Sequence, residues 1–289
     1  MGFAENKVDQ CIYLKLRESK FIIIVFYVDD ILLASNDYDL LVETRNMLSV
    51  SFDMKNLGEA SFVLGIKIHR DRFSKFLGLS QKAYIDHILK QFNMKHCKPN
   101  DVPIAKGDKL CKDQCPKNDI EKRSMENVPY ASAVGSLMYA QVCTRLDLSF
   151  VISVLGRFLS NAGHAHWVAT KKVMRYLQKT KEYMLVYKRV YYLDVNGYSD
   201  LDFAACPDDK KYTFGYVFML AKGVVSWKRV KQTLTASTMQ AKFIACYRAT
   251  SHAMWLKNFV SALEIVDSIS KPLKKIVTTV LLFSLPRTT

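Results

Sequence analysis

Residues 21–35 read FIIIVFYVDDILLAS, and this stretch says more about the local structure than any other. Two β-branched and aromatic runs, 21–27 and 31–34, are separated only by Val28, Asp29 and Asp30. Runs of this composition favour β-strands, and so short a connection favours an antiparallel pair. The sequence therefore predicts a tight β-hairpin that carries two carboxylates at its turn.

The acidic pair has two interpretations. Asp is common in hairpin turns, so Asp29 and Asp30 can simply be turn residues. Adjacent carboxylates also repel each other beside apolar strands, and a divalent cation removes that cost. Phosphoryl transfer by two metal ions needs hard oxygen ligands on a rigid support, which a hairpin provides. The residues alone leave both interpretations open.

Composition indicates a folded protein with a polyanionic partner. The chain has 289 residues, of which 49% are hydrophobic and 24% charged, which excludes wholesale disorder and leaves room for about two domains. Its 42 Lys and Arg against 27 Asp and Glu give a net charge of +15, which favours nucleic acid over an anionic membrane surface. We find no apolar run of about 20 residues and no signal-peptide core, so we expect no membrane partner. The seven cysteines contain no CxxC pair, which favours a reducing, intracellular compartment.

The order of the expected elements predicts an α+β protein. We expect Ser35 or Asn36 to cap a helix that reaches about residue 50, and 62–69 to form one strand of a second hairpin with 75–79. The Lys-rich stretch 96–128 is the expected linker between region 1–95 and the helices of region 129–190. The last region, 191–289, has three expected strands (191–199, 212–220 and 224–230) and a helix at 238–263.

Four cations lie on or just beyond the polar side of the expected helix at 166–178. They are Lys171, Lys172, Arg175 and Lys179. A solvated helix face is one interpretation of this pattern. With the overall excess of positive charge, a face that follows nucleic-acid phosphates is the other.

The hairpin motif also carries a family resemblance. The tetrapeptide YVDD at 27–30 resembles the YxDD hairpin of reverse transcriptases, and its flanks resemble the Pol polyproteins of copia-type LTR retrotransposons. Further blocks follow in the order of that family, so the similarity extends over about residues 10–275. These blocks include DMKNLG at 53–58, FVLGIKI at 62–68, LSQKAYI at 79–85 and YASAVGSLMY at 130–139.

The resemblance implies that Asp29 and Asp30 bind Mg²⁺ together with a third Asp on an earlier strand, and that the partners are an RNA template, a DNA primer or an RNA–DNA hybrid. No Asp before Tyr27 stands in a matching context. We therefore expect a C-terminal piece of the polymerase, with part of the palm and thumb followed by a helical connection. It should be inactive alone, require the remainder of the polyprotein, and reside in a cytoplasmic particle or the nucleus.

The final region resembles the ribonuclease H domain that ends these polyproteins. Its block GYSDLD at 197–202 contains Asp200, which the resemblance makes a second Mg²⁺ ligand beside acids on the following helix. Gln240 and Lys242 occupy the candidate positions for those helix acids, and a Lys there would repel metal ions. The tail after Lys275 also departs from the family, as a frameshift would produce. We therefore expect a truncated, inactive ribonuclease H-like α/β domain.

Two other classes of function stay open. The chain could be a non-catalytic nucleic-acid-binding relic of a transposable element, whose basic faces still hold an RNA–DNA hybrid. It could also be a fragment without a biochemical role. Binding measured over a series of salt concentrations separates these two, because phosphate contacts weaken steeply with salt.

Overall fold

The computed structural model describes residues 2–105, 108–191, 193–202, 213–231, 238–264 and 274–278. The chain divides into two compact units. Unit 1 consists of Met1–Ser61, Tyr191–Val195 and Thr250–Leu273, and unit 2 of Phe62–Val190, Asn196–Ala249 and Lys274–Thr289. Each unit is described by itself below.

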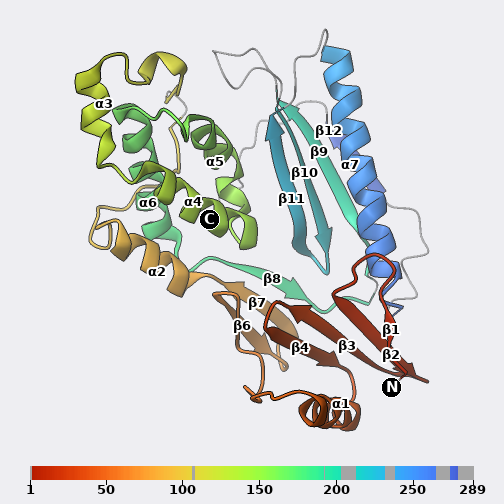
Figure 1. The fold of residues 1–289 in the computed structure, drawn as a ribbon. Helices are drawn as coiled ribbons and strands as arrows, with labels where there is room; N and C mark the ends of the chain where they lie inside the picture. Colours follow the sequence, from red (N-terminus) through yellow and green to blue (C-terminus); the bar gives the residue numbers. More distant parts are fainter. Residues whose placement is uncertain are drawn as a thin grey trace. The chain divides into compact units, whose positions relative to one another are not determined.

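Unit 1 is built on an antiparallel sheet with strand order β1-β2-β3-β4 (Figure 1). Helix α1 contacts β3 and β4 and so covers one face of this sheet. Ile22 and Ile24 of β3 are buried, as are Leu40 and Leu48 of α1, which forms the apolar layer beneath the helix. The bounds are β1 Ala4–Glu5, β2 Ile12–Arg17, β3 Lys20–Tyr27, β4 Asp30–Ser35 and α1 Tyr38–Ser51.

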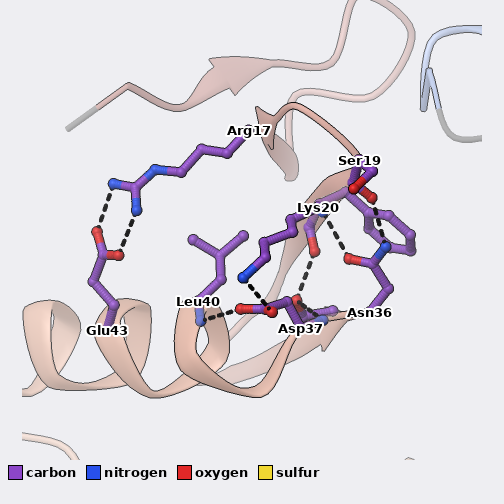
Figure 2. A network of polar contacts seen from close by, with 9 residues as sticks. Arg17, Ser19, Lys20, Asn36, Asp37, Leu40 and Glu43 are labelled. Carbon is purple, nitrogen blue, oxygen red and sulfur yellow. Dashed lines mark hydrogen bonds and ion pairs between the residues drawn. The ribbon is translucent and has the colours of Figure 1, made fainter.

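Helix α1 begins at an aspartate that also forms an ion pair. The Asp37 carboxylate accepts the backbone N–H of Leu40 at 2.9 Å, which is N-capping geometry, and Lys20 pairs with its other oxygen at 2.7 Å. One turn further on, Arg17 donates two hydrogen bonds to Glu43, at 2.7 and 2.8 Å (Figure 2). These contacts fix α1 to the turn between β2 and β3.

The prediction that Ser35 or Asn36 caps this helix was wrong. The Asn36 side chain donates to the carbonyl of Ser19 and accepts the N–H of Phe21, both at 2.8 Å (Figure 2). The Ser35 hydroxyl donates to the carbonyl of Phe21 at 2.6 Å. Both side chains thus bond to the backbone at the beginning of β3, and Asp37 occupies the N-cap position.

Unit 2 contains a second antiparallel sheet, with order β5-β6-β7-β8. The expected single strand at 62–69 is instead two strands, because Leu64 and Gly65 both have positive φ, +51° and +72°, and reverse the chain. Strand β8 follows the helices in the sequence and pairs with β7, so that Met184 lies opposite Ser80. The bounds are β5 Phe62–Val63, β6 Ile66–Asp71, β7 Phe76–Ser80 and β8 Met184–Lys188.

The helices of unit 2 share one apolar core. Leu89, Leu137, Leu155 and Leu177 have no exposed surface, and they come from four different helices. Helix α5 is short, with a 3-10 turn directly before it and another directly after it. The bounds are α2 Lys82–Gln91, η1 Lys112–Gln114, α3 Asp119–Glu126, α4 Tyr130–Cys143, η2 Leu146–Leu148, α5 Ser149–Leu155, η3 Gly156–Phe158 and α6 His164–Thr180.

A third sheet, with order β11-β10-β9-β12, also lies in unit 2. Three strands are antiparallel, and β12 joins β9 in parallel. Trp227 of β11 donates its indole N–H to the carbonyl of Gln141 at 3.1 Å, and the Arg229 guanidinium lies 4.7 Å from the ring centre of Phe150. These contacts hold β11 against α4 and α5. The bounds are β9 Asn196–Asp202, β10 Thr213–Leu220, β11 Gly223–Lys231, α7 Thr238–Ser261 and β12 Lys274–Thr278. The residues of α7 from Thr250 onward belong to unit 1.

Helices and predominantly antiparallel sheets together confirm the predicted α+β class. Within the described part of the chain, every helix is too short or too polar to cross a lipid bilayer.

Candidate metal-binding hairpin

The predicted hairpin at 21–35 is confirmed, and its turn is the tightest form that an antiparallel pair allows. Tyr27 at the end of β3 pairs directly with Asp30 at the start of β4. Val28 and Asp29 alone form the connection. One carboxylate is therefore in the turn and the next is the first residue of a strand.

Both carboxylates lie at an exposed tip above a buried base. Asp29 and Asp30 are exposed, whereas Ile22 and Ile24 further along β3 are 0% and 3% exposed. Because the apolar strands are anchored in the sheet, the tip holds its two acids on a rigid support. Carboxylate oxygens are the ligands that Mg²⁺ prefers, so the donor chemistry fits that ion.

The hairpin offers two ligands, and a two-metal centre needs more than two. Over the described ranges, no group of three or more His, Cys, Asp or Glu side chains is placed to hold a metal ion. The expected contribution of a third acid from another segment thus stays a prediction.

Sequence reasoning did not identify Val28 as unusual. This residue has φ of +52°, and its side chain is 88% exposed. Positive φ is a genuine outlier for a β-branched residue, and strain of this kind is typically kept where function requires it. The sequence analysis placed Val28, Asp29 and Asp30 in the connection, whereas the structure leaves only Val28 and Asp29 there. The common hairpin turns of two residues have positive φ in their first central residue, which explains the conformation of Val28.

Asp200 lies near the end of β9, at the centre of the third sheet. Its backbone pairs with Gly215 of β10 on one side and with Thr278 of β12 on the other. Gln240 and Lys242 follow in the first two turns of α7 and are both exposed. The expected tail beyond residue 278 lies outside the described residues.

The four cations predicted to follow phosphates on α6 make contacts within the protein. Lys172 pairs with both oxygens of Asp108 at 2.8 Å, and this ion pair holds the pKa of Asp108 below its ordinary value. Lys179 pairs with Asp101, which raises the pKa of Lys179.

The other two cations of α6 are also engaged. Arg175 donates to the carbonyl of Lys98 at 2.7 Å, and the Lys171 ammonium lies 5.7 Å from the ring centre of Trp167. The Arg175 hydrogen bond and the two ion pairs fasten residues of the 98–108 stretch, which we expected to be a linker, to α6. Phosphate binding by this face stays a prediction.

Comparison with known proteins bears directly on the hairpin. Residues 1–106, which contain the acidic tip, match the family described as reverse transcriptase (RNA-dependent DNA polymerase). The retrovirus-related Pol polyprotein from transposon TNT 1-94 of Nicotiana tabacum is 43% identical over 257 residues, which are 88% of this chain and 19% of that protein. The corresponding polyprotein from transposon RE2 of Arabidopsis thaliana is 31% identical over 266 residues, 92% of this chain and 18% of that protein.

A shorter relative matches only part of the chain. Secreted RxLR effector protein 161 of Plasmopara viticola is 44% identical over 133 residues, which are 46% of this chain and 94% of that protein. No solved structure gives a significant match.

The matched hairpin and its flanking residues define the reverse transcriptase class for the first third of the molecule. The chain belongs to the family of copia-type retrotransposon Pol polyproteins, and its residues 1–106 represent part of their reverse transcriptase region, as the sequence resemblance predicted. It spans about a fifth of the length of the Pol polyproteins that it matches.

Proposed function

We propose that Asp29 and Asp30 are Mg²⁺ ligands of a polymerase centre, in a chain that acts on an RNA template and a DNA primer as a segment of a longer Pol polyprotein. The observation that carries this proposal is the exposed acidic pair on a two-residue turn, within the region that matches the reverse transcriptase family. A bare two-residue turn needs positive φ at its first position, but it needs neither a β-branched residue there nor two adjacent acids.

The role of the hairpin in this proposal is to hold the two negatively charged carboxylates at one position, where they can bind Mg²⁺. Bound Mg²⁺ supplies neutralisation of phosphate charge and activation of a primer hydroxyl. The chain's own contribution is to hold two carboxylate groups at adjacent positions, with the 54% exposed side chain of Tyr27 beside them. The buried strands resist displacement of the tip, which keeps the ligand positions fixed.

Metal binding to the hairpin is testable without activity. Mn²⁺ is a paramagnetic substitute for Mg²⁺, and its binding to the 289-residue chain can be followed by the loss of the free-ion signal in electron paramagnetic resonance. Asp29→Asn with Asp30→Asn should weaken the strongest Mn²⁺ site at least tenfold, because both hard oxygen charges are lost.

The matched control removes the same charge from elsewhere in unit 1. Asp39→Asn with Asp53→Asn changes two exposed acids outside the hairpin and should leave the Mn²⁺ affinity within about twofold. Equal losses in the two double variants would mean that Mn²⁺ follows net charge alone, and would contradict the proposal.

We also propose that region 191–289 is a truncated ribonuclease H-like domain, with Asp200 on strand β9 as a ligand position. The support is the topology: three antiparallel strands, a helix and then a parallel return to β9, the strand that carries Asp200. Residues 129–190 would then be the helical connection between the two regions. Lys242 on α7 opposes a metal centre there, so this second centre should be inactive.

The isolated chain should therefore show neither primer extension nor cleavage of an RNA–DNA hybrid in Mg²⁺. The expected reason is too few converging acids, since two cations need several negative ligands. Primer extension that disappears in Asp29→Asn would overturn the expected inactivity while supporting the metal-ligand role. Addition of a second polypeptide that carries the upstream polymerase region is the corresponding test for complementation.

A further inference from the structure

An open pocket in unit 2 is lined by nine residues, of which five carry cationic side chains. It lies where the β6–β7 hairpin meets the end of β8. Five exposed cations line it, with Asp71 as the one acid in the lining. The cations are Arg70, Arg72, Lys75, Lys188 and Arg189.

Strand register explains why cations distant in sequence meet here. Arg70 of β6 pairs with Leu77 of β7, which pairs in turn with Tyr187 of β8, so these three side chains share a face of the sheet. Beyond the end of β8, the N–H of Arg189 bonds to the carbonyl of Lys75 at 3.0 Å. The backbone thereby holds Lys75 and Arg189 next to each other.

The positive charge of the pocket is not neutralised by its acid. One Asp71 oxygen accepts the N–H of Ser74 at 2.7 Å and so closes the β6–β7 turn. Within the described part of the chain, Lys75, Lys188 and Arg189 form no ion pair with a carboxylate. Like charges gathered in one pocket repel each other, and an anionic ligand removes that repulsion.

An exposed aromatic residue lies between the lining residues Arg72 and Lys75 in the sequence. Phe73 in the β6–β7 turn is 97% exposed, although its neighbours Phe76 and Leu77 are half-buried. Exposed rings beside cations form the usual platform for single-stranded nucleic acid, with bases stacked on the ring and phosphates on the cations. A single ring beside basic residues is a weak membrane anchor, because stable attachment takes more buried apolar surface.

The pocket also has a firm floor. The Tyr187 hydroxyl donates to the carbonyl of Val224 at 2.7 Å, and a Cβ at Gly223 would lie 2.4 Å from the Tyr187 ring. The ring is thus packed tightly against β11, and Tyr187 is part of the pocket lining. A ligand would meet a preformed surface here.

We propose that this basic pocket binds single-stranded nucleic acid, with Lys75 and Arg189 on successive phosphates and Phe73 stacked on a base. The site lies in unit 2 and uses neither Asp29 nor Asp30. A negative result for nucleic-acid binding by the pocket would therefore leave the proposed metal binding by the hairpin intact, and the reverse also holds.

Fluorescence anisotropy of a labelled oligo(dT) of about 20 nucleotides tests the pocket, since that length exceeds a typical site of roughly 4–16 nucleotides. The full chain is used in EDTA, which removes any contribution from metal at the hairpin. Lys75→Glu with Arg189→Glu should weaken binding at least tenfold and reduce the slope of log affinity against log salt by about 0.7 for each phosphate that is no longer neutralised. Phe73→Ala should weaken binding about fivefold or more with an unchanged slope.

The matched control reverses two exposed cations elsewhere, Lys55→Glu with Lys90→Glu, and should change affinity less than about threefold. A control loss equal to that of the pocket variant would overturn the proposal, because binding would then follow net charge. Unchanged affinity in either pocket variant, or displacement of the oligonucleotide by anionic phosphatidylserine vesicles that depends on Phe73, would overturn it too. The milder Lys75→Gln with Arg189→Gln should keep the fold and give an intermediate loss.

Discussion

At the scale of single residues, Val28 in the hairpin turn has a strained backbone conformation and a solvent-exposed side chain. Its backbone has φ of +52° while its side chain is 88% exposed, so the side chain contributes little packing in return. Strain at such positions is of the order of 1–3 kcal/mol. The conformation is maintained by the paired strands on both sides, since Tyr27 and Asp30 face each other across the turn.

Val28→Gly should therefore stabilise the protein by about 1 kcal/mol. Glycine adopts positive φ without strain, and this gain exceeds the added entropy of the unfolded chain, about 0.5–1 kcal/mol. The measurement is the free energy of unfolding from urea denaturation, followed by circular dichroism. Val50→Gly is the control, because Val50 is 90% exposed in helix α1 and glycine there should destabilise. Destabilisation of similar size in both variants would contradict the strain argument.

The charged residues of α6 show why site prediction is harder at this scale than hairpin prediction. A run of apolar residues around two acids is visible locally, whereas the partners of Lys172 and Lys179 lie far away in sequence, at Asp108 and Asp101. Likewise, the pattern gives no sign that Arg145 is 2% exposed and bonded to Asp147. Ion pairs depend on tertiary contacts, which composition and periodicity do not contain.

At the scale of elements, helix α1 depends on two ion pairs that titrate. The ion pair with Lys20 and the N–H of Leu40 hold the pKa of Asp37 below its ordinary value, and the hydrogen bonds from Arg17 lower the pKa of Glu43. A carboxyl group whose pKa is lower in the folded state stabilises the fold at pH values above its unfolded-state pKa. This stabilisation is lost as the pH falls through the pKa of the folded state. Both groups are solvent-exposed enough for salt to weaken these contacts.

Unfolding free energy should therefore fall as the pH drops below about 4, near the unfolded pKa values of Asp and Glu. Asp37→Asn with Glu43→Gln should make this fall shallower, since both titrating pairs are removed. Chemical denaturation at a series of pH values measures the effect. Asp39→Asn serves as the reference for removing a carboxylate from the first turn of the helix. Identical pH slopes in the double variant and the unmodified chain would show that these ion pairs do not titrate with folding.

The elements predicted from sequence are those with a local signal. The hairpin at 21–35 and the helices α1 and α6 follow from composition and periodicity, and they begin and end within a few residues of the expected positions. The missed elements depend on distant partners. Strand β8 forms only because Ser80 is available to pair with Met184, and β12 only because β9 leaves an edge for it. Short strands of this kind have little intrinsic preference.

At the scale of the whole molecule, the two units have separate sets of buried apolar residues. The large helical core of α2, α4, α5 and α6 lies entirely in unit 2, whereas Ile22, Ile24 and Leu40 are buried in unit 1. Trp255 is in unit 1, and Trp167 and Trp227 are in unit 2. Fluorescence can therefore report on each unit.

Leu137→Ala should destabilise unit 2 by about 2–5 kcal/mol, because Leu137 has no exposed surface and its truncation leaves a cavity. In variants that keep only Trp167, the urea midpoint should shift to lower concentration. In variants that keep only Trp255, the shift should be smaller, since unit 1 retains its own core. Equal shifts with both probes would show that the chain unfolds as one cooperative body.

The pairing of β7 with β8 has a consequence for synthesis on the ribosome. Residues 76–80 leave the exit tunnel long before residues 184–188, and all of the helical core is translated between them. Until then β7 presents a bare row of amide and carbonyl groups on the side where β8 will dock. The nascent polypeptide thus exposes an unpaired strand edge through much of its translation. A ribosome that stalls before codon 184 therefore releases a product that is prone to aggregate.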